Sequence, residues 1–174
     1  MNIENVEKKL RAARFALDQM IEQDRMAVGK EEQFDIYLSA FLAAGMSVRN
    51  AFHVEQDRER NEAVKKWKSD WEARLSPEEG CLWDFMREDR NHEVHRGGSS
   101  RIVKTENREF GAGTHKLADR TMDVTGAPGF ARVTIHAPGY YFTIEGVERR
   151  ATEACGEYLT LLEQMGAAFR TEFR

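Results

Sequence analysis

The chain has 174 residues, 32% of them charged and 41% hydrophobic, which is the balance of a globular protein rather than of a disordered one. Its length suits a single domain, residues 1–174, whose core needs no disulfide or metal to hold it. A net charge of −4 argues against a protein that coats nucleic acid nonspecifically.

Three helices are predicted in the first half of the chain, because apolar residues recur there every three or four positions. They cover residues 3–20, 34–52 and 64–75. Gly45 in the second helix would let another helix approach closely, although glycine costs about 1 kcal/mol relative to alanine in a helix.

A fourth helix is predicted to begin at the residues SPEE. Ser76 is a good N-cap, Pro77 suits the first helical position, and Glu79 stands where a capping box has its acidic residue. The helix is expected to end at RGGSS, because paired glycines end helices.

The character of the sequence changes after this helix. Residues 96–130 contain six glycines and show no helical period, so a long irregular excursion is predicted. A β-hairpin is predicted next, because ARVTIH and YYFTIE are rich in β-branched and aromatic residues and flank Ala137-Pro138-Gly139. A last helix is predicted over residues 147–173. The expected fold class is therefore an all-α bundle of about five helices, with a hairpin or irregular insertion at about 96–144.

The end of the fourth helix, WDFMREDRNHEVHRGG, crowds three arginines and two histidines between Arg87 and Arg96. On a helical projection Asp89, Arg90 and Glu93 fall within the arc of apolar side chains, where a charge is costly unless it is paired or functional. One explanation is a structural ion pair between Arg90 and Glu93, which are three residues apart. This pair would account for Arg90 without any chemistry.

A second explanation is a metal site formed by His92 and His95. The sequence HEVH is one residue shorter than the zincin motif, and nothing indicates which residue would supply a third ligand. No metal and no cofactor are therefore expected.

A third explanation comes from RNHEVH, which places Arg90 five residues before His95 with the polar Asn91 beside the arginine. This spacing resembles the R-x4-6-H signature of the HEPN superfamily (higher eukaryotes and prokaryotes nucleotide-binding). The resemblance extends to the order of the long helix FDIYLSAFLAAGMSVRNAF, a tryptophan-bearing helix, the motif helix and a final long helix. It implies a HEPN-like helical domain, with the insertion at 96–144 outside the family's compact core.

The resemblance implies a metal-independent endoribonuclease that is a homodimer, with Arg90, Asn91 and His95 as catalytic residues at the dimer interface. The RNA 2′-hydroxyl would attack the neighbouring phosphate, and an imidazole and a guanidinium suit the proton transfer and the growing charge. Arg87 and His92 have the same spacing and are secondary candidates.

Arg90 and His95 are about 140° apart on an ideal helix, so they need either two facing copies or an unwound last turn to act together. Arg96, Arg101 and Lys104 are expected to contact the RNA backbone. A toxin or defence role with an antitoxin-like protein partner is one expectation. The alternative is a non-catalytic module that binds RNA, a nucleotide or another protein.

The two cysteines, Cys81 and Cys155, have no metal-binding or disulfide spacing and are expected to be free thiols of a cytoplasmic protein. No apolar run approaches the roughly 20 residues needed to span a bilayer. The charged first residues show no secretory signal, so no membrane partner is expected.

Overall fold

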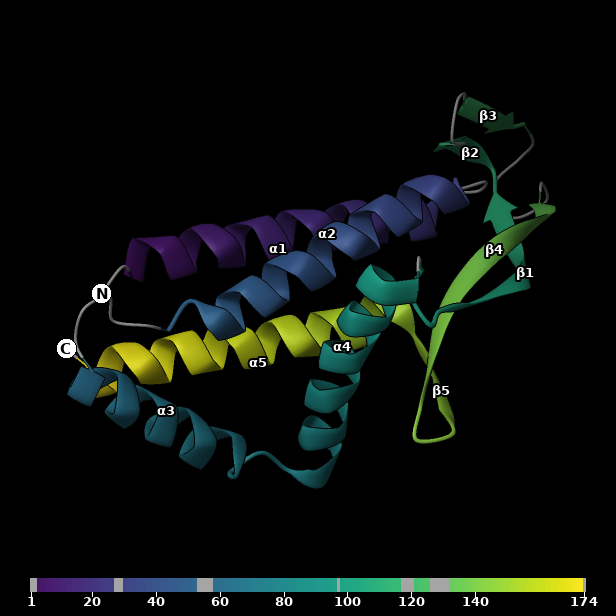
Figure 1. Cartoon of the computed structure of the whole chain (residues 1–174). Helices are drawn as coiled ribbons and strands as arrows, with labels where there is room; N and C mark the ends of the chain where they lie inside the picture. Colours follow the sequence, from purple (N-terminus) through teal and green to yellow (C-terminus); the bar gives the residue numbers. More distant parts are fainter. Residues whose placement is uncertain are drawn as a thin grey trace.

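Five helices and two antiparallel sheets make up the described part of the computed structural model (Figure 1). The described residues are 3–26, 30–52, 58–96, 98–116, 121–125 and 132–173. In chain order the elements are α1 (Ile3–Arg25), α2 (Glu31–Asn50), α3 (Arg58–Glu72), α4 (Pro77–Arg96), β1 (Ile102–Gly111), β2 (Gly113–Lys116), β3 (Thr121–Val124), β4 (Arg132–Ile144), β5 (Val147–Arg150) and α5 (Ala151–Glu172).

The fold is a mixture of α and β structure, so the expectation of an all-α bundle is wrong. One sheet has the strand order β1-β4-β5, and β2 pairs with β3 in the other. Strand β1 occupies ten residues of the segment for which an irregular excursion was predicted. Each of these residues is paired with β4 in antiparallel register, which gives the insertion a regular backbone.

The predicted hairpin around Ala137-Pro138-Gly139 is also wrong, because these residues lie inside the continuous strand β4. Pro138 pairs with Thr105 of β1, and β5 pairs with β4 only from Tyr141 onward. At Pro138, therefore, β4 has one described neighbour, and the missing proline N–H can face the open side without removing a ladder bond.

The helices α1, α2 and α5 lie side by side, and α4 runs at a steep angle to them (Figure 1). Their apolar faces meet in one core that includes Phe34, Phe41 and Leu162. A Cβ added to Gly45 would lie 2.9 Å from Cε1 of Tyr158, so the close helix approach predicted at this glycine is confirmed.

Both ends of α4 agree with the sequence prediction. The amide of Glu79 donates to Oγ of Ser76 at 3.2 Å, and the amide of Ser76 donates to Oε2 of Glu79 at 2.8 Å, which is a complete capping box. The helix ends at Arg96, directly before the paired glycines at which its end was predicted. The last helix differs, because α5 begins at Ala151 and Val147 is an exposed residue of β5.

The β1-β4-β5 sheet belongs to the same core as the helices. The Tyr140 ring of β4 stacks on Phe34 of α2 with centroids 3.7 Å apart, and Phe142 contacts Phe85 of α4 at 5.0 Å. Tyr140 and Phe142 are both fully buried. The sheet is thus held against α2 and α4 by aromatic packing.

A group of charged and polar side chains joins the end of α1 to the sheet and to α5. This group, which we call the Asp24 cluster, consists of Asp24, Glu106, Arg108, Tyr141, Arg150 and Thr152. Asp24 accepts from Arg150 Nε at 2.7 Å and from Arg108 Nη2 at 3.3 Å. Glu106 accepts from the same two arginines at 3.1 and 3.2 Å and from the Tyr141 hydroxyl.

Glu106 lies directly over Gly139, where an added Cβ would overlap its carboxylate. Burial raises the pKa of Glu106, but hydrogen bonds from Tyr141 and Arg150 and the charge of Arg108 outweigh this effect and leave the pKa below its ordinary value. The charged form of Glu106 is therefore the form that the cluster stabilises.

Candidate functional site

The second half of α4 carries the RNHEVH motif on a helix that continues to Arg96. Arg90 and His95 are consequently separated by five residues of unbroken α-helix, which places them about 140° apart around its axis. The backbone up to Arg96 does not unwind to bring them together. The side chains of His95 and Arg96 lie outside the described part of the structure, and Asn91 is exposed to solvent.

Arg90 is half-buried, and its Nε atom is buried with no hydrogen-bond partner. The expected ion pair with Glu93 is not formed, and Glu93 instead accepts a hydrogen bond from Ser39 of α2. Other arginines withdrawn from solvent in the described structure each pair with a carboxylate: Arg49, Arg101, Arg108 and Arg150. Among the described carboxylates, none forms such a pair with Arg90.

Asp89 is a buried carboxylate beside this arginine, with only 3% of its surface exposed. Its Oδ1 accepts the Ser100 amide at 2.6 Å, whereas Oδ2 is buried without a partner. Burial raises the pKa of Asp89, and the hydrogen bond from Ser100 opposes this effect only in part. A buried carboxylate and a half-buried guanidinium, each with an unsatisfied atom, therefore lie next to each other on α4.

The secondary candidates Arg87 and His92 have partners of their own. Arg87 pairs with Asp84 at 3.0 Å on the surface of α4. Nδ1 of His92 lies 2.8 Å from the carbonyl oxygen of Gly98. Because a carbonyl oxygen can only accept, His92 must carry a hydrogen on Nδ1, which leaves Nε2 with the lone pair when the ring is neutral.

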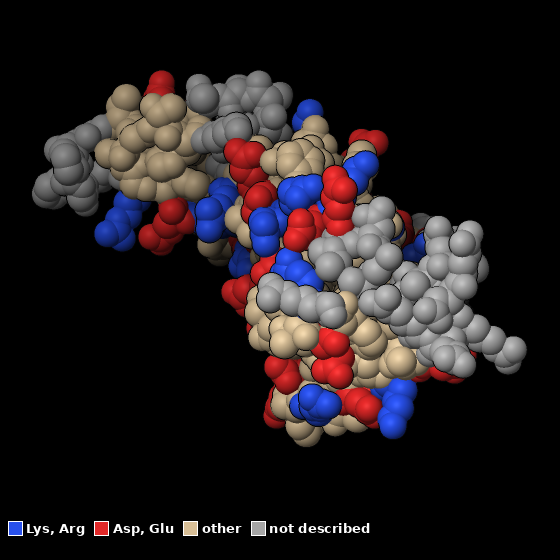
Figure 2. Space-filling view, turned by 90° about the vertical axis from the view of Figure 1, so that its left-hand side faces the viewer, with Lys and Arg blue, Asp and Glu red and all other residues tan. Residues whose placement is uncertain are grey.

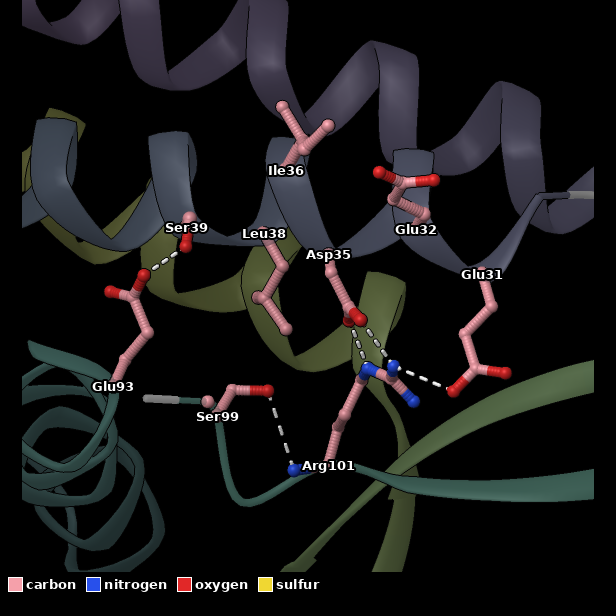
Figure 3. Close-up of a pocket in the computed structure, with 10 residues that line it drawn as sticks. Glu31, Glu32, Asp35, Ile36, Leu38, Ser39, Glu93, Ser99 and Arg101 are labelled. Carbon is pink, nitrogen blue, oxygen red and sulfur yellow. Dashed lines mark hydrogen bonds and ion pairs between the residues drawn. The ribbon is translucent and has the colours of Figure 1, made fainter. Parts of the chain in front are cut away.

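A cleft of about 710 Å³ opens between α2 and the end of α4 (Figure 3). We call it the acidic cleft, because four of its lining residues are carboxylates: Glu31, Glu32, Asp35 and Glu93. Among the residues whose side chains are described, Arg101 is the arginine in its lining, and its guanidinium donates to Asp35 and to Glu31. The cleft therefore has an excess of negative charge.

Two of the predicted RNA contacts are engaged within the chain. Arg101 pairs with Asp35 and Glu31, and Lys104 pairs with Glu148 of β5. An RNA phosphate would have to compete with these carboxylates for either cation. The described side chains on the face in Figure 2 show acidic and basic residues interspersed, with neither sign forming a broad patch.

The α2 side of the acidic cleft was not predicted from the sequence. Glu31, Asp35 and Ser39 follow one another at intervals of four residues, so they lie along one stripe of α2. Ser39 faces Glu93 of α4, and the two acids face Arg101 beyond the helix end (Figure 3). The i, i+4 spacing of the two acids was a local signal for this stripe. Its meeting with Glu93 and Arg101 is a tertiary contact that no local pattern indicates.

Comparisons with protein-family models, with curated proteins and with solved structures find no match. None of the described helices combines the length and apolarity that a bilayer crossing requires. Cys81 and Cys155 are both free thiols. The resemblance to HEPN proteins therefore stays a prediction from the RNHEVH motif and from the order of helices in the sequence.

Proposed function

We propose that this chain is a HEPN-type, metal-independent endoribonuclease that acts as a homodimer, with Arg90, Asn91 and His95 in its active site. The observation that carries the proposal is the unpartnered Nε of Arg90. A buried guanidinium N–H without an acceptor is costly, and an anionic ligand that accepts from it would offset that cost. A phosphodiester fits the planar arrangement of guanidinium donors.

The residue types suit cleavage by the RNA 2′-hydroxyl. A neutral imidazole at position 95 would take the hydroxyl proton while the oxygen attacks the adjacent phosphorus. Arg90 would stabilise the charge that grows on the phosphoryl oxygens, and the exposed Asn91 would bind a neighbouring phosphate or ribose. As the bond between phosphorus and the 5′-oxygen breaks, the leaving oxygen would take a proton from water, and the imidazolium would return its own proton to solvent. The products would be a 2′,3′-cyclic phosphate and a free 5′-hydroxyl.

The straight course of α4 supports a site built from two copies. Since Arg90 and His95 lie on different faces of one unbroken helix, a second protomer is the simplest source of the missing partner for each. Light scattering at tens of micromolar is expected to give about 40 kDa, twice the 20.0 kDa of one chain. A mass of one chain under these conditions would contradict the two-copy site.

The acidic cleft favours a second candidate function, that of a non-catalytic interaction module. Four carboxylates near the end of α4 would repel an RNA strand and attract a basic protein segment, such as that of an antitoxin-like partner. In both cases we propose a cytoplasmic location, which the two free thiols support.

Cleavage of RNA by the purified chain in EDTA tests the first proposal directly. We expect His95→Ala to abolish cleavage and leave RNA binding nearly intact. Arg90→Ala should lower the rate about 10²–10³-fold and also weaken binding, because its phosphate contact exists before the reaction. Arg87→Ala is the matched control, since Arg87 is a partly exposed arginine of the same helix that already pairs with Asp84.

Three results would exclude the nuclease proposal. They are full activity in His95→Ala, equal losses in Arg87→Ala and Arg90→Ala, and strong inhibition by EDTA. Absence of both cleavage and RNA binding at low salt would leave the interaction module as the better description. The circular dichroism of each variant establishes that the fold is retained.

A further inference from the structure

The chain that leaves α4 turns back and is fastened to the same helix at two points. The carbonyl oxygen of Gly98 lies 2.8 Å from Nδ1 of His92, and the amide of Ser100 donates to Oδ1 of Asp89 at 2.6 Å. A third contact follows at once, because Arg101 reaches across to Asp35 of α2. The segment 98–101 is therefore held between α4 and α2, and it forms part of the wall of the acidic cleft (Figure 3).

The contact between the His92 side chain and the Gly98 backbone closes a loop of residues 92–98, which includes His95. The last turn of an α-helix is prone to fray, because its final carbonyl groups have no partners further along the helix. Here the residues after the last turn are tied to a side chain within the helix. Loss of that tie would free the turn that includes His95 and leave Arg90, which precedes His92, in place.

We infer that His92 is a positioning residue, which acts through the Gly98 carbonyl to hold the last turn of α4 and thereby His95. The inference rests on the proposed function, because it assigns His95 the proton transfer. Nδ1 carries a hydrogen in the required neutral tautomer and also in the imidazolium ion, so acidification does not break this contact.

Two substitutions separate the roles of the two ring nitrogens. In His92→Asn the side-chain amide nitrogen takes the place of Nδ1 and can still donate to Gly98. In His92→Gln the amide takes the place of Nε2, and the donor to Gly98 is lost. Glutamine also has a higher helix propensity than histidine or asparagine, so a loss in His92→Gln cannot come from a weaker intrinsic preference for helix.

The first measurement is hydrogen exchange at the backbone amides of residues 95 and 96. We expect exchange in His92→Gln to be about fivefold faster than in the original chain, which corresponds to the loss of one hydrogen bond. His92→Asn should exchange at the original rate. Nitrogen NMR of the original chain should place the hydrogen of neutral His92 on Nδ1.

The second measurement is RNA cleavage in EDTA. His92→Gln is expected to lower kcat by on the order of 10-fold with KM unchanged, because a misplaced catalytic group slows the step without weakening the phosphate contact of Arg90. His92→Asn should restore most of the rate, and its pH profile should match that of the original chain.

The outcomes test the positioning role of His92 separately from the proposed nuclease function. Equal losses in both variants, or a changed pH profile in His92→Asn, would show that Nε2 acts on the substrate and would overturn the positioning role. Unchanged exchange in His92→Gln would overturn it as well. If the original chain does not cleave RNA, the nuclease proposal fails, and the exchange rates still decide whether His92 holds the end of α4.

Discussion

The substitution Asp24→Ala removes a buried carboxylate from the centre of the Asp24 cluster. Only 7% of Asp24 is exposed, and it accepts hydrogen bonds from Arg108, Arg150 and the Thr152 hydroxyl. Without it, the two arginines keep Glu106 as their remaining charged partner in the cluster. The change therefore leaves positive charge in a place that is poorly reached by water.

The size of the effect follows from this burial. Removing one partner of a buried ion pair costs about 3–5 kcal/mol when the remaining charge has no other partner. Glu106 still binds both arginines, and the side chains of Arg108 and Arg150 are 14% and 29% exposed, so we expect the lower end, about 3 kcal/mol. For a chain of this length that corresponds to a fall in Tm of roughly 6–12 °C.

Thermal and urea unfolding followed by circular dichroism would measure this loss. Asp24→Asn should lose less than Asp24→Ala, because the amide oxygen still accepts. Glu163→Ala is the matched control, because it breaks an ion pair with Arg14 on the surface. The Glu163 side chain is 38% exposed and that of Arg14 is 55% exposed, and such surface pairs contribute about 0–1 kcal/mol to the free energy of unfolding. If Asp24→Ala costs no more than Glu163→Ala, the cluster does not hold α1 to the sheet.

Two further predictions concern the stability of the fold at acidic pH and the effect of replacing two glycines by alanine. The lowered pKa of Glu106 makes its contribution complete above its unfolded pKa of about 4.3, and this contribution is lost as the pH falls through the folded value. Glu106→Gln should therefore flatten the decline in unfolding free energy between about pH 5 and pH 3, and an unchanged slope would contradict the shift. Gly139→Ala should destabilise the fold by displacing Glu106. Gly80 lies in α4 with open space around it, so Gly80→Ala should raise the free energy of unfolding by about 0.5–1 kcal/mol. Urea unfolding of the two glycine variants should therefore show changes of opposite sign.

The helices could be predicted from the sequence because their signals are local. Ser76 and Glu79 are three residues apart, and the capping box that they form needs no other part of the chain. The β1-β4-β5 sheet was missed for the opposite reason. Ile102 pairs with Tyr141, 39 residues away, and no pattern within β1 points to that partner. The turn signal at Pro138 was overridden by the same long-range ladder.

The site shows the same division between local and distant contacts. The sequence placed Asp89, Arg90 and Glu93 toward the core side of α4, and the structure buries Asp89 and half-buries the other two. Their partners could not be predicted, because Ser39 lies on α2 and Ser100 lies beyond the helix end. The expected pairing of Arg90 with Glu93 therefore gave way to a tertiary contact.

The position of α5 has a consequence for how the chain acquires its structure during synthesis. It is the last of the described helices, yet 11 of its 22 residues are buried, against α1, α2, α4 and the sheet. Until these residues leave the ribosome, the apolar faces of the earlier helices have no surface to cover them, and such faces promote aggregation. We therefore expect the nascent chain to stay without a settled core, and to need protection by chaperones, until α5 has emerged.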